Sequence, residues 1–164
     1  MNDPSSLRVA VITISDSVSS GKSEDKSGPA VIARCRELGW EIKSSLVIPD
    51  DPPSIREQLR ELADSGRLDL ILTTGGTGLS PRDSTPEATM AIADRLIPGF
   101  AEEMRRKGME KTPQAILSRA VAAVRNKSLI INLPGSPRGA VESLDALADL
   151  LPHSIAIIHG VRHE

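Results

Sequence analysis

Residues 73–87 read Thr73-Thr74-Gly75-Gly76-Thr77-Gly78-Leu79-Ser80-Pro81-Arg82-Asp83-Ser84-Thr85-Pro86-Glu87, and the rest of the chain is arranged around this stretch. The apolar run at 68–72 before it is typical of a buried strand. Thr85-Pro86 predicts a helix that begins with an N-cap residue followed by a proline. The stretch is therefore a turn from a strand into a helix.

This turn is suited to bind phosphate. Gly75, Gly76 and Gly78 leave backbone N–H groups uncovered and allow positive φ, and a nearby helix N-terminus favours anions. The turn also carries Asp83, whose repulsion of a phosphate at about 4 Å is roughly 4 kcal/mol at an effective dielectric near 20. That exceeds the ~0.3–1 kcal/mol that a helix N-terminus contributes. We therefore expect a phosphate to arrive here with a divalent metal ion. Two structural alternatives for Asp83 are an ion pair with Arg82 and a cap on the following helix.

The composition suits one globular domain over residues 1–164, with 39% hydrophobic and 26% charged residues. The net charge of −2, with one Trp, one Phe and no Tyr, argues against nucleic-acid binding. No stretch approaches the ~18 apolar residues of a membrane span, and the N-terminus does not resemble a signal peptide. The single cysteine, Cys35, is expected to be a buried thiol and fits a reducing compartment. We expect a soluble, cytoplasmic protein.

Strand and helix patterns alternate along the chain. Apolar runs predict strands at 7–15, 40–48, 68–72, 120–124 and 129–133. Helical patterns and caps predict helices at 28–38, 54–66, 86–95, 98–107 and 141–151, a short one from 112, and a helix rather than a strand at 153–159. This order predicts an α/β fold with a mostly parallel sheet, helices on both faces and one antiparallel edge strand from the hairpin around 125–128.

Three loops should meet at one edge of this sheet. Turns follow Ser15, Thr74 and Leu133, each at the end of a predicted strand, and open α/β sheets bind ligands along their carboxyl edge. Residues 15–17, 75–83 and 134–137 are thus predicted to share one crevice, with Asp50 as a further acid.

Familiar catalytic and nucleotide motifs are absent. Gly21-Lys22-Ser23 resembles the end of a P-loop, but the first glycine of that motif would fall at Asp16. Gly76-Thr77-Gly78 lacks the third glycine of a dinucleotide fingerprint, because position 81 is proline. The three histidines all lie near the C-terminus, where surface or core-edge roles are expected.

At five motifs the sequence resembles the Mog/MoaB family of molybdopterin-binding proteins, over almost the whole chain. The motifs are Ile14-Ser15-Asp16-Ser17, Ile48-Pro49-Asp50, residues 74–88, Ala115-Ile116-Leu117-Ser118-Arg119, and Ile131-Asn132-Leu133-Pro134-Gly135-Ser136-Pro137. The resemblance implies a three-layer α/β/α domain, usually a homotrimer. It also implies transfer of AMP from Mg-ATP to the terminal phosphate of molybdopterin, with release of pyrophosphate and hand-over to a molybdenum insertase.

The resemblance also implies roles for individual residues. Asp50 and Asp83 are implied as the acids on which activity depends, with ligation of Mg²⁺ or of its water shell as their physical role. The glycine turn, at Gly75, Gly76, Thr77 and Gly78, would hold phosphate. Contacts to pterin or nucleotide are implied for Ser15, Asp16, Ser118, Arg119, Pro134, Gly135 and Ser136.

Some alternatives stay open. Asp51 leaves the register of the first acid open by one residue, and Asp50 is favoured because it directly follows Pro49. Arg119 has a structural alternative as a solvated partner of a helix dipole, and residues 105–107 are expected to form a solvated helix face. The alternative function is a non-catalytic molybdopterin carrier or an oligomeric scaffold.

Overall fold

In the computed structural model, which describes residues 5–161, six strands form one sheet in the order β2-β1-β3-β6-β5-β4. The strands are β1 (Arg8–Ile14), β2 (Glu41–Ile48), β3 (Leu70–Thr74), β4 (Arg95–Leu96), β5 (Ala122–Arg125) and β6 (Ser128–Leu133). β2, β1, β3 and β6 run parallel, whereas β5 is antiparallel to both β6 and β4. The predicted α/β class, with an antiparallel strand at one end of the sheet, is confirmed.

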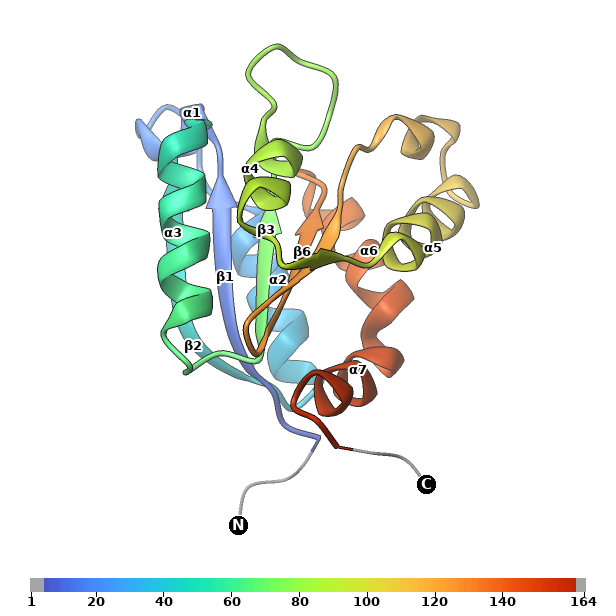
Figure 1. The fold of residues 1–164 in the computed structure, drawn as a ribbon. Coiled ribbons are helices and arrows are strands. Elements are labelled where there is room, and N and C mark those ends of the chain that lie inside the picture. Colours follow the sequence, from blue (N-terminus) through green and yellow to red (C-terminus); the bar gives the residue numbers. More distant parts are fainter. Residues whose placement is uncertain (1–4, 162–164) are drawn as a thin grey trace.

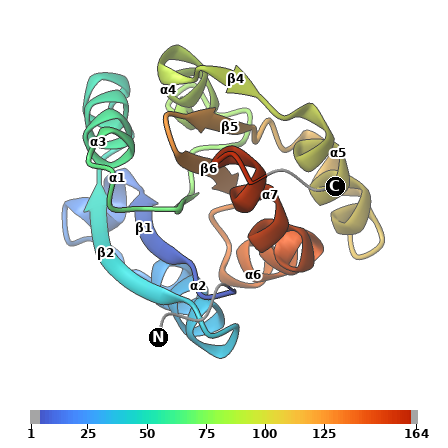
Figure 2. The same ribbon diagram turned by 60° about the horizontal axis from the view of Figure 1, so that its bottom comes forward.

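Helices cover both faces of the sheet (Figures 1 and 2). They are α1 (Asp16–Ser19), α2 (Ser27–Glu37), α3 (Pro52–Asp64), α4 (Thr85–Ile92), α5 (Pro98–Met109), α6 (Pro137–Leu147) and α7 (Leu151–Ile158), with 3₁₀ helices η1 (Pro113–Leu117) and η2 (Ala148–Leu150). Alternate β1 residues face opposite cores: Val9 and Val11 pack with α2, α5, α6 and α7, whereas Ala10 and Ile12 pack with α3 and α4. The arrangement is a three-layer α/β/α sandwich. No helix of residues 5–161 is long and apolar enough to cross a membrane.

The parallel register aligns the ends of three strands. Thr13 of β1 lies beside Thr74 of β3, and Thr74 lies beside Leu133 of β6. The loops that follow these strands therefore leave the same carboxyl edge, as predicted. Figure 1 shows the loop after β3 projecting beyond the end of the sheet.

Several boundaries differ from the prediction for local reasons. α3 begins at Pro52 because Asp51, and not Ser54, caps it: the Asp51 carboxylate accepts the Ser54 N–H at 3.1 Å. α4 ends at Ile92, before the predicted 95, because the next residues pair with β5 and form β4. The predicted loop at 16–27 contains the short helix α1, capped by the Ser15 hydroxyl. The hairpin turn is shorter than predicted, since Arg125 and Ser128 still pair.

Candidate active site at the carboxyl edge of the sheet

The glycine turn is too tightly enclosed for side chains at its first two glycines. Gly75 and Gly76 have φ of 103° and 69°. A Cβ at Gly75 would lie 2.2 Å from the Ile14 carbonyl oxygen, and one at Gly76 would lie 2.3 Å from the Thr85 hydroxyl. That hydroxyl donates to the Gly75 carbonyl at 3.0 Å, and so it fixes the turn instead of capping α4, whose N-cap is Ser84.

Two of the three glycine amides are free to bind a ligand. The Gly75 N–H already donates to the Leu133 carbonyl at 3.1 Å, so this amide, which was expected to hold phosphate, is occupied in the structure. Within residues 5–161, the amides of Gly76 and Gly78 donate to no other group. Thr77 is 6% exposed, and its carbonyl accepts the Arg119 N–H at 2.9 Å. The anion-binding capacity of the turn therefore rests on Gly76 and Gly78.

Asp50 faces this turn from the end of β2. Its Oδ2 accepts the Asp16 N–H at 3.0 Å, while Asp16 Oδ1 accepts the Asp50 N–H at the same distance. Asp50 Oδ1 is buried with no hydrogen-bond partner among the described residues, and it would lie 3.0 Å from a Cβ at Gly76. Burial raises the pKa of Asp50, and the nearby carboxylates of Asp16 and Asp83 add to the rise. A buried acceptor of this kind requires a donor or a cation.

Asp51 has a separate structural role. Its carboxylate accepts both the amide and the hydroxyl of Ser54, the latter at 2.6 Å. Because this side chain caps α3, the geometry favours Asp50 as the acid of the site.

Asp83 approaches the turn from the other side. Its Oδ2 accepts the Ser80 N–H at 3.1 Å and would lie 2.9 Å from a Cβ at Gly78. Neither structural alternative for Asp83 is present, because Arg82 donates instead to both oxygens of Asp16, at 2.9 and 3.0 Å, and no side chain caps α4. The hydrogen bonds from Arg82 hold the pKa of Asp16 below its usual value. Asp16 thus holds Asp50 in place through two hydrogen bonds and holds the loop that carries Asp83 through Arg82.

Asp50 and Asp83 line one hollow of about 410 Å³, called here the acid hollow. Ser15, Gly75, Gly76 and Gly135 line it too, from the three loops predicted to meet, whereas Thr77, Gly78 and Asp16 lie outside its lining. Ser15 also caps α1, where its hydroxyl accepts the Val18 N–H.

The loop before α2 contributes residues that sequence reasoning missed. Glu24, Asp25, Lys26 and Ser27 line the acid hollow. The Asp25 carboxylate accepts the Thr13 hydroxyl at 2.9 Å and the Gly28 amide at 3.0 Å, which fixes this loop over β1. The sequence feature that could have indicated this loop is the acid Asp25, three residues before Gly28 at the start of a helix. Lys26 makes no hydrogen bond or ion pair through its side chain within residues 5–161, and it is the one lysine in the described lining.

The turn at 134–136 separates the acid hollow from a second hollow. Thr74 donates its hydroxyl to the Pro134 carbonyl at 2.6 Å, and a Cβ at Gly135 would lie 3.3 Å from Gly75 Cα. The Ser136 hydroxyl caps α6 by accepting the Gly139 amide. The second hollow, of about 230 Å³, is lined by Met104, Arg105, Ser118, Pro134, Ser136 and Glu142, among others.

Ser118 and Arg119 have different surroundings. Ser118 lines the second hollow, and its hydroxyl accepts the Ala120 amide at 3.3 Å. Arg119 points at the glycine turn, where it donates to the carbonyls of Gly78 and Asp83 and pairs with Glu87, so it is not a solvated dipole partner.

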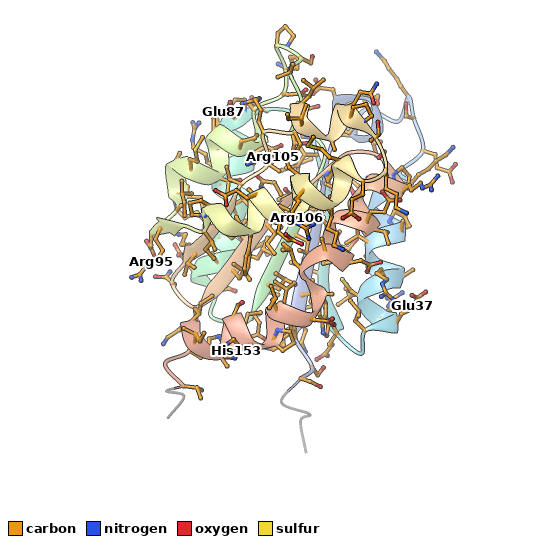
Figure 3. All side chains as sticks on the ribbon, turned by 90° about the vertical axis from the view of Figure 1, so that its right-hand side faces the viewer. Glu37, Glu87, Arg95, Arg105, Arg106 and His153 are labelled. Atoms are coloured by element: carbon orange, nitrogen blue, oxygen red, sulfur yellow. The ribbon has the colours of Figure 1, made fainter. Side chains whose placement is uncertain are left out.

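Arg105, expected on a solvated helix face, donates instead to the Ser118 and Ala120 carbonyls. Figure 3 shows Glu87 and Arg105 toward one end of the molecule and His153 toward the other.

The chain is similar to known proteins over most of its length. Residues 10–153 match the family model described as "probable molybdopterin binding domain". The chain is 42% identical over 158 residues to the molybdopterin adenylyltransferase of Escherichia coli (strain K12), covering 94% of this chain and 80% of that one. It is 39% identical over 161 residues to the molybdopterin adenylyltransferase of Helicobacter pylori (strain J99), with 94% and 89% covered.

The fold has close matches among solved structures. The molybdopterin biosynthesis enzyme MoaB from Thermus thermophilus superposes with a TM-score of 0.89 at 47% identity, over 96% of this chain and 99% of that one. The family match, the identities and the shared fold lead to one conclusion: the chain belongs to the molybdopterin-binding domain family, with Mog and MoaB among its relatives.

Proposed function

We propose that this protein is a molybdopterin adenylyltransferase of molybdenum cofactor biosynthesis, which transfers AMP from ATP to the terminal phosphate of molybdopterin. The observation that carries the proposal is the acid hollow. It places the unpartnered Oδ1 of Asp50 and the carboxylate of Asp83 beside Gly76, whose amide is free. The Asp83 carboxylate also lies against Gly78, the second glycine with a free amide, which is outside the lining of the hollow. The names and identities of the two bacterial relatives support the reaction.

The residues of the acid hollow fit a magnesium ion. Within residues 5–161 no three His, Cys, Asp or Glu side chains form a ready-made metal site. Mg²⁺ is commonly held by one or two carboxylates together with substrate phosphates and water, so Asp50 and Asp83 are a sufficient protein contribution. When bound, the ion neutralises charge on the phosphates. We assign Asp50 and Asp83 to Mg²⁺ and to catalysis.

The chain's own groups position two polyanions for the reaction. An oxygen of the molybdopterin phosphate attacks the α-phosphorus of ATP, and the bond from this phosphorus to the bridging oxygen breaks, so that pyrophosphate leaves with the electron pair. The amides of Gly76 and Gly78 donate to the phosphate oxygens, and Lys26 offsets their charge. Such chemistry is mainly positioning and electrostatics. We assign the second hollow, with Ser118 and Ser136, to the pterin ring.

The decisive experiment follows product formation. Purified protein is incubated with molybdopterin, ATP and Mg²⁺, while pyrophosphate and adenylyl-molybdopterin are measured. Asp50→Asn and Asp83→Asn should each lower the rate at least about 100-fold. Asp51→Asn is the matched control and should keep the rate, because asparagine also caps helices. Molybdopterin binding without AMP transfer would refute the enzyme and identify the non-catalytic carrier.

The wider assignments belong to the same proposal. We place residues 1–164 in one domain, supported by the single sheet, and the protein in the cytoplasm, supported by the buried free thiol of Cys35. We also propose a homotrimer, supported by exposed apolar side chains such as Leu79 and Ile116, which are 65% and 61% exposed. Light scattering after size exclusion should give three times the 17.5 kDa chain mass, and a monomer would refute the trimer. The product would pass to a molybdenum insertase.

A further inference from the structure

Arg119 binds both limbs of the loop that carries Asp83. Its backbone N–H donates to the Thr77 carbonyl at 2.9 Å, and its Nε donates to the Gly78 carbonyl at 2.8 Å. On the other limb, its Nη2 donates to the Asp83 carbonyl at 2.9 Å, and its Nη1 pairs with the Glu87 carboxylate in the first turn of α4. One side chain thus joins the start and the end of the projecting loop.

The loop between these contacts has few other attachments. Residues 79–82 are all exposed, and Leu79 is 65% exposed. From this tip, the one side-chain link to another element within the described residues is the ion pair of Arg82 with Asp16. Because glycines precede the tip, the backbone around Gly78 and Asp83 has wide conformational freedom without an external constraint. Arg119 supplies that constraint.

The contacts of Arg119 suit a positioning role and not substrate binding. All of its side-chain donors that have partners are directed at the loop or at α4, and Arg119 is not among the described residues that line the acid hollow. The planar guanidinium reaches two carbonyls and a carboxylate at fixed angles, which a lysine ammonium cannot reproduce.

We propose that Arg119 is a positioning residue for adenylyl transfer: it fixes the backbone of Gly78 and Asp83, so that the Gly78 amide and the Asp83 carboxylate are held in reactive geometry. Glu87 in turn holds the guanidinium. The inference rests on the proposed function, since it assigns Arg119 a part in that reaction.

Steady-state kinetics test the role, with Arg125→Ala as the matched control. Arg125 makes a similar fork at the opposite edge of the sheet, to both oxygens of Asp64 and to the Ile92 carbonyl. We expect Arg119→Ala to lower kcat about 100-fold with little change in the KM for ATP, because small misplacements of reacting groups cost this much. Arg119→Lys should restore little of kcat, and Arg125→Ala should leave it unchanged. A raised KM with normal kcat, full rescue by lysine, or an equal loss in Arg125→Ala would overturn the proposal.

A double-mutant cycle tests whether Arg119 acts through Asp83. In an Asp83→Ala background, Arg119→Ala should lower the remaining rate only a few-fold, since the group that it positions is already absent. Losses that multiply would show an independent role and contradict the proposal.

Hydrogen exchange tests the positioning without relying on activity. The hydrogen-bonded amides of the loop, those of Ser80, Asp83 and Thr85, should exchange at least about 10-fold faster in Arg119→Ala than in the wild type, and at an unchanged rate in Arg125→Ala. Unchanged exchange in Arg119→Ala would refute the positioning role. If the wild-type protein transfers no AMP, the proposed function fails by itself, while exchange still decides whether Arg119 holds the loop.

Discussion

The two oxygens of the Asp50 carboxylate have different surroundings. Oδ2 accepts the Asp16 amide, whereas Oδ1 is buried without a partner among the described residues. Folding therefore places a charge where neither water nor protein solvates it fully, and the raised pKa of Asp50 expresses this. Such a group destabilises the free protein and is compensated when a cation binds.

Asp50→Asn should stabilise the free protein while it abolishes activity. Because the folded-state pKa of Asp50 is raised, the penalty is absent below the unfolded-state pKa and complete once the pH exceeds the folded-state pKa. At pH 7 we expect the melting temperature to rise by roughly 2–4 °C, the shift for about 1 kcal/mol in a domain of this size. The gain should disappear near pH 3 in thermal melts without Mg²⁺. A lower melting temperature at pH 7 would contradict this account.

Lys26 is one of the residues of the acid hollow for which sequence reasoning offered no role. As the one lysine in the described lining of the acid hollow, it should bind the phosphates of ATP. Lys26→Ala should raise the KM for ATP about 10-fold, the factor that corresponds to 1.4 kcal/mol. Lys43→Ala is the control, because Lys43 pairs with Glu41 on the edge strand β2. Equal KM values for wild type and Lys26→Ala would remove Lys26 from the site.

At the scale of elements, strands and helices could be predicted where the spacing of apolar residues clearly follows one kind of secondary structure. The buried runs of β1, β3 and β6 and the apolar stripe of α3 are set by local sequence, so the shared carboxyl edge followed from their order. Asp50, Asp83, Ser15 and the glycine turn came to this edge because each lies in a segment that follows a strand. Their proximity could therefore be predicted without knowledge of side-chain packing.

What was not predictable depends on partners distant in sequence. β4 has two residues and forms because β5 is available to pair with it. Arg119 donates a hydrogen bond to Gly78, which lies 41 positions earlier in the chain. Arg82 forms its ion pair with Asp16, 66 positions earlier, and not with its neighbour Asp83. The Gly75 amide is taken by Leu133 of a neighbouring strand. The spacing of residues along the sequence indicates none of these contacts.

The glycine turn makes a prediction at this scale. Gly75→Ala combines positive φ with a Cβ placed 2.2 Å from the Ile14 carbonyl oxygen, whereas Gly39→Ala combines a similar φ of 82° with open space. Strained φ alone costs about 1–2 kcal/mol. Urea unfolding should show that loss for Gly39→Ala and a clearly larger loss for Gly75→Ala, because β1 must move. Equal losses would mean that the turn is not packed against β1.

At the scale of the whole molecule, one charged cluster connects several elements at the amino edge of the sheet. This edge lies opposite the candidate active site. Asp69, 7% exposed, accepts the Arg8 amide at 2.8 Å and the Arg8 guanidinium at 3.2 and 3.0 Å. His159, after α7, has its Nε2 3.5 Å from Asp69 Oδ1 and 3.1 Å from the Lys127 carbonyl. The cluster connects β1, the start of β3, the hairpin and the end of the last helix.

This cluster should set the acid stability of the protein. Burial alone would raise the pKa of Asp69, but the hydrogen bonds from Arg8 outweigh it and hold the pKa below its ordinary value. A lowered folded-state pKa gives stability that is complete above the unfolded-state pKa, about 3.9, and is lost as pH falls through the folded-state pKa.

We therefore compare wild type with Asp69→Asn by urea unfolding at several pH values. At pH 7 the variant should lose about 1.5–3 kcal/mol, the range for hydrogen bonds to a charged group. Below about pH 4 the difference should shrink, because Asp69 of the wild type becomes protonated and its pair with Arg8 loses its charge. The opposite shift at Asp50 is common to both proteins and cancels in the comparison. A difference independent of pH would mean that Asp69 stabilises the sheet edge by shape and neutral hydrogen bonds alone.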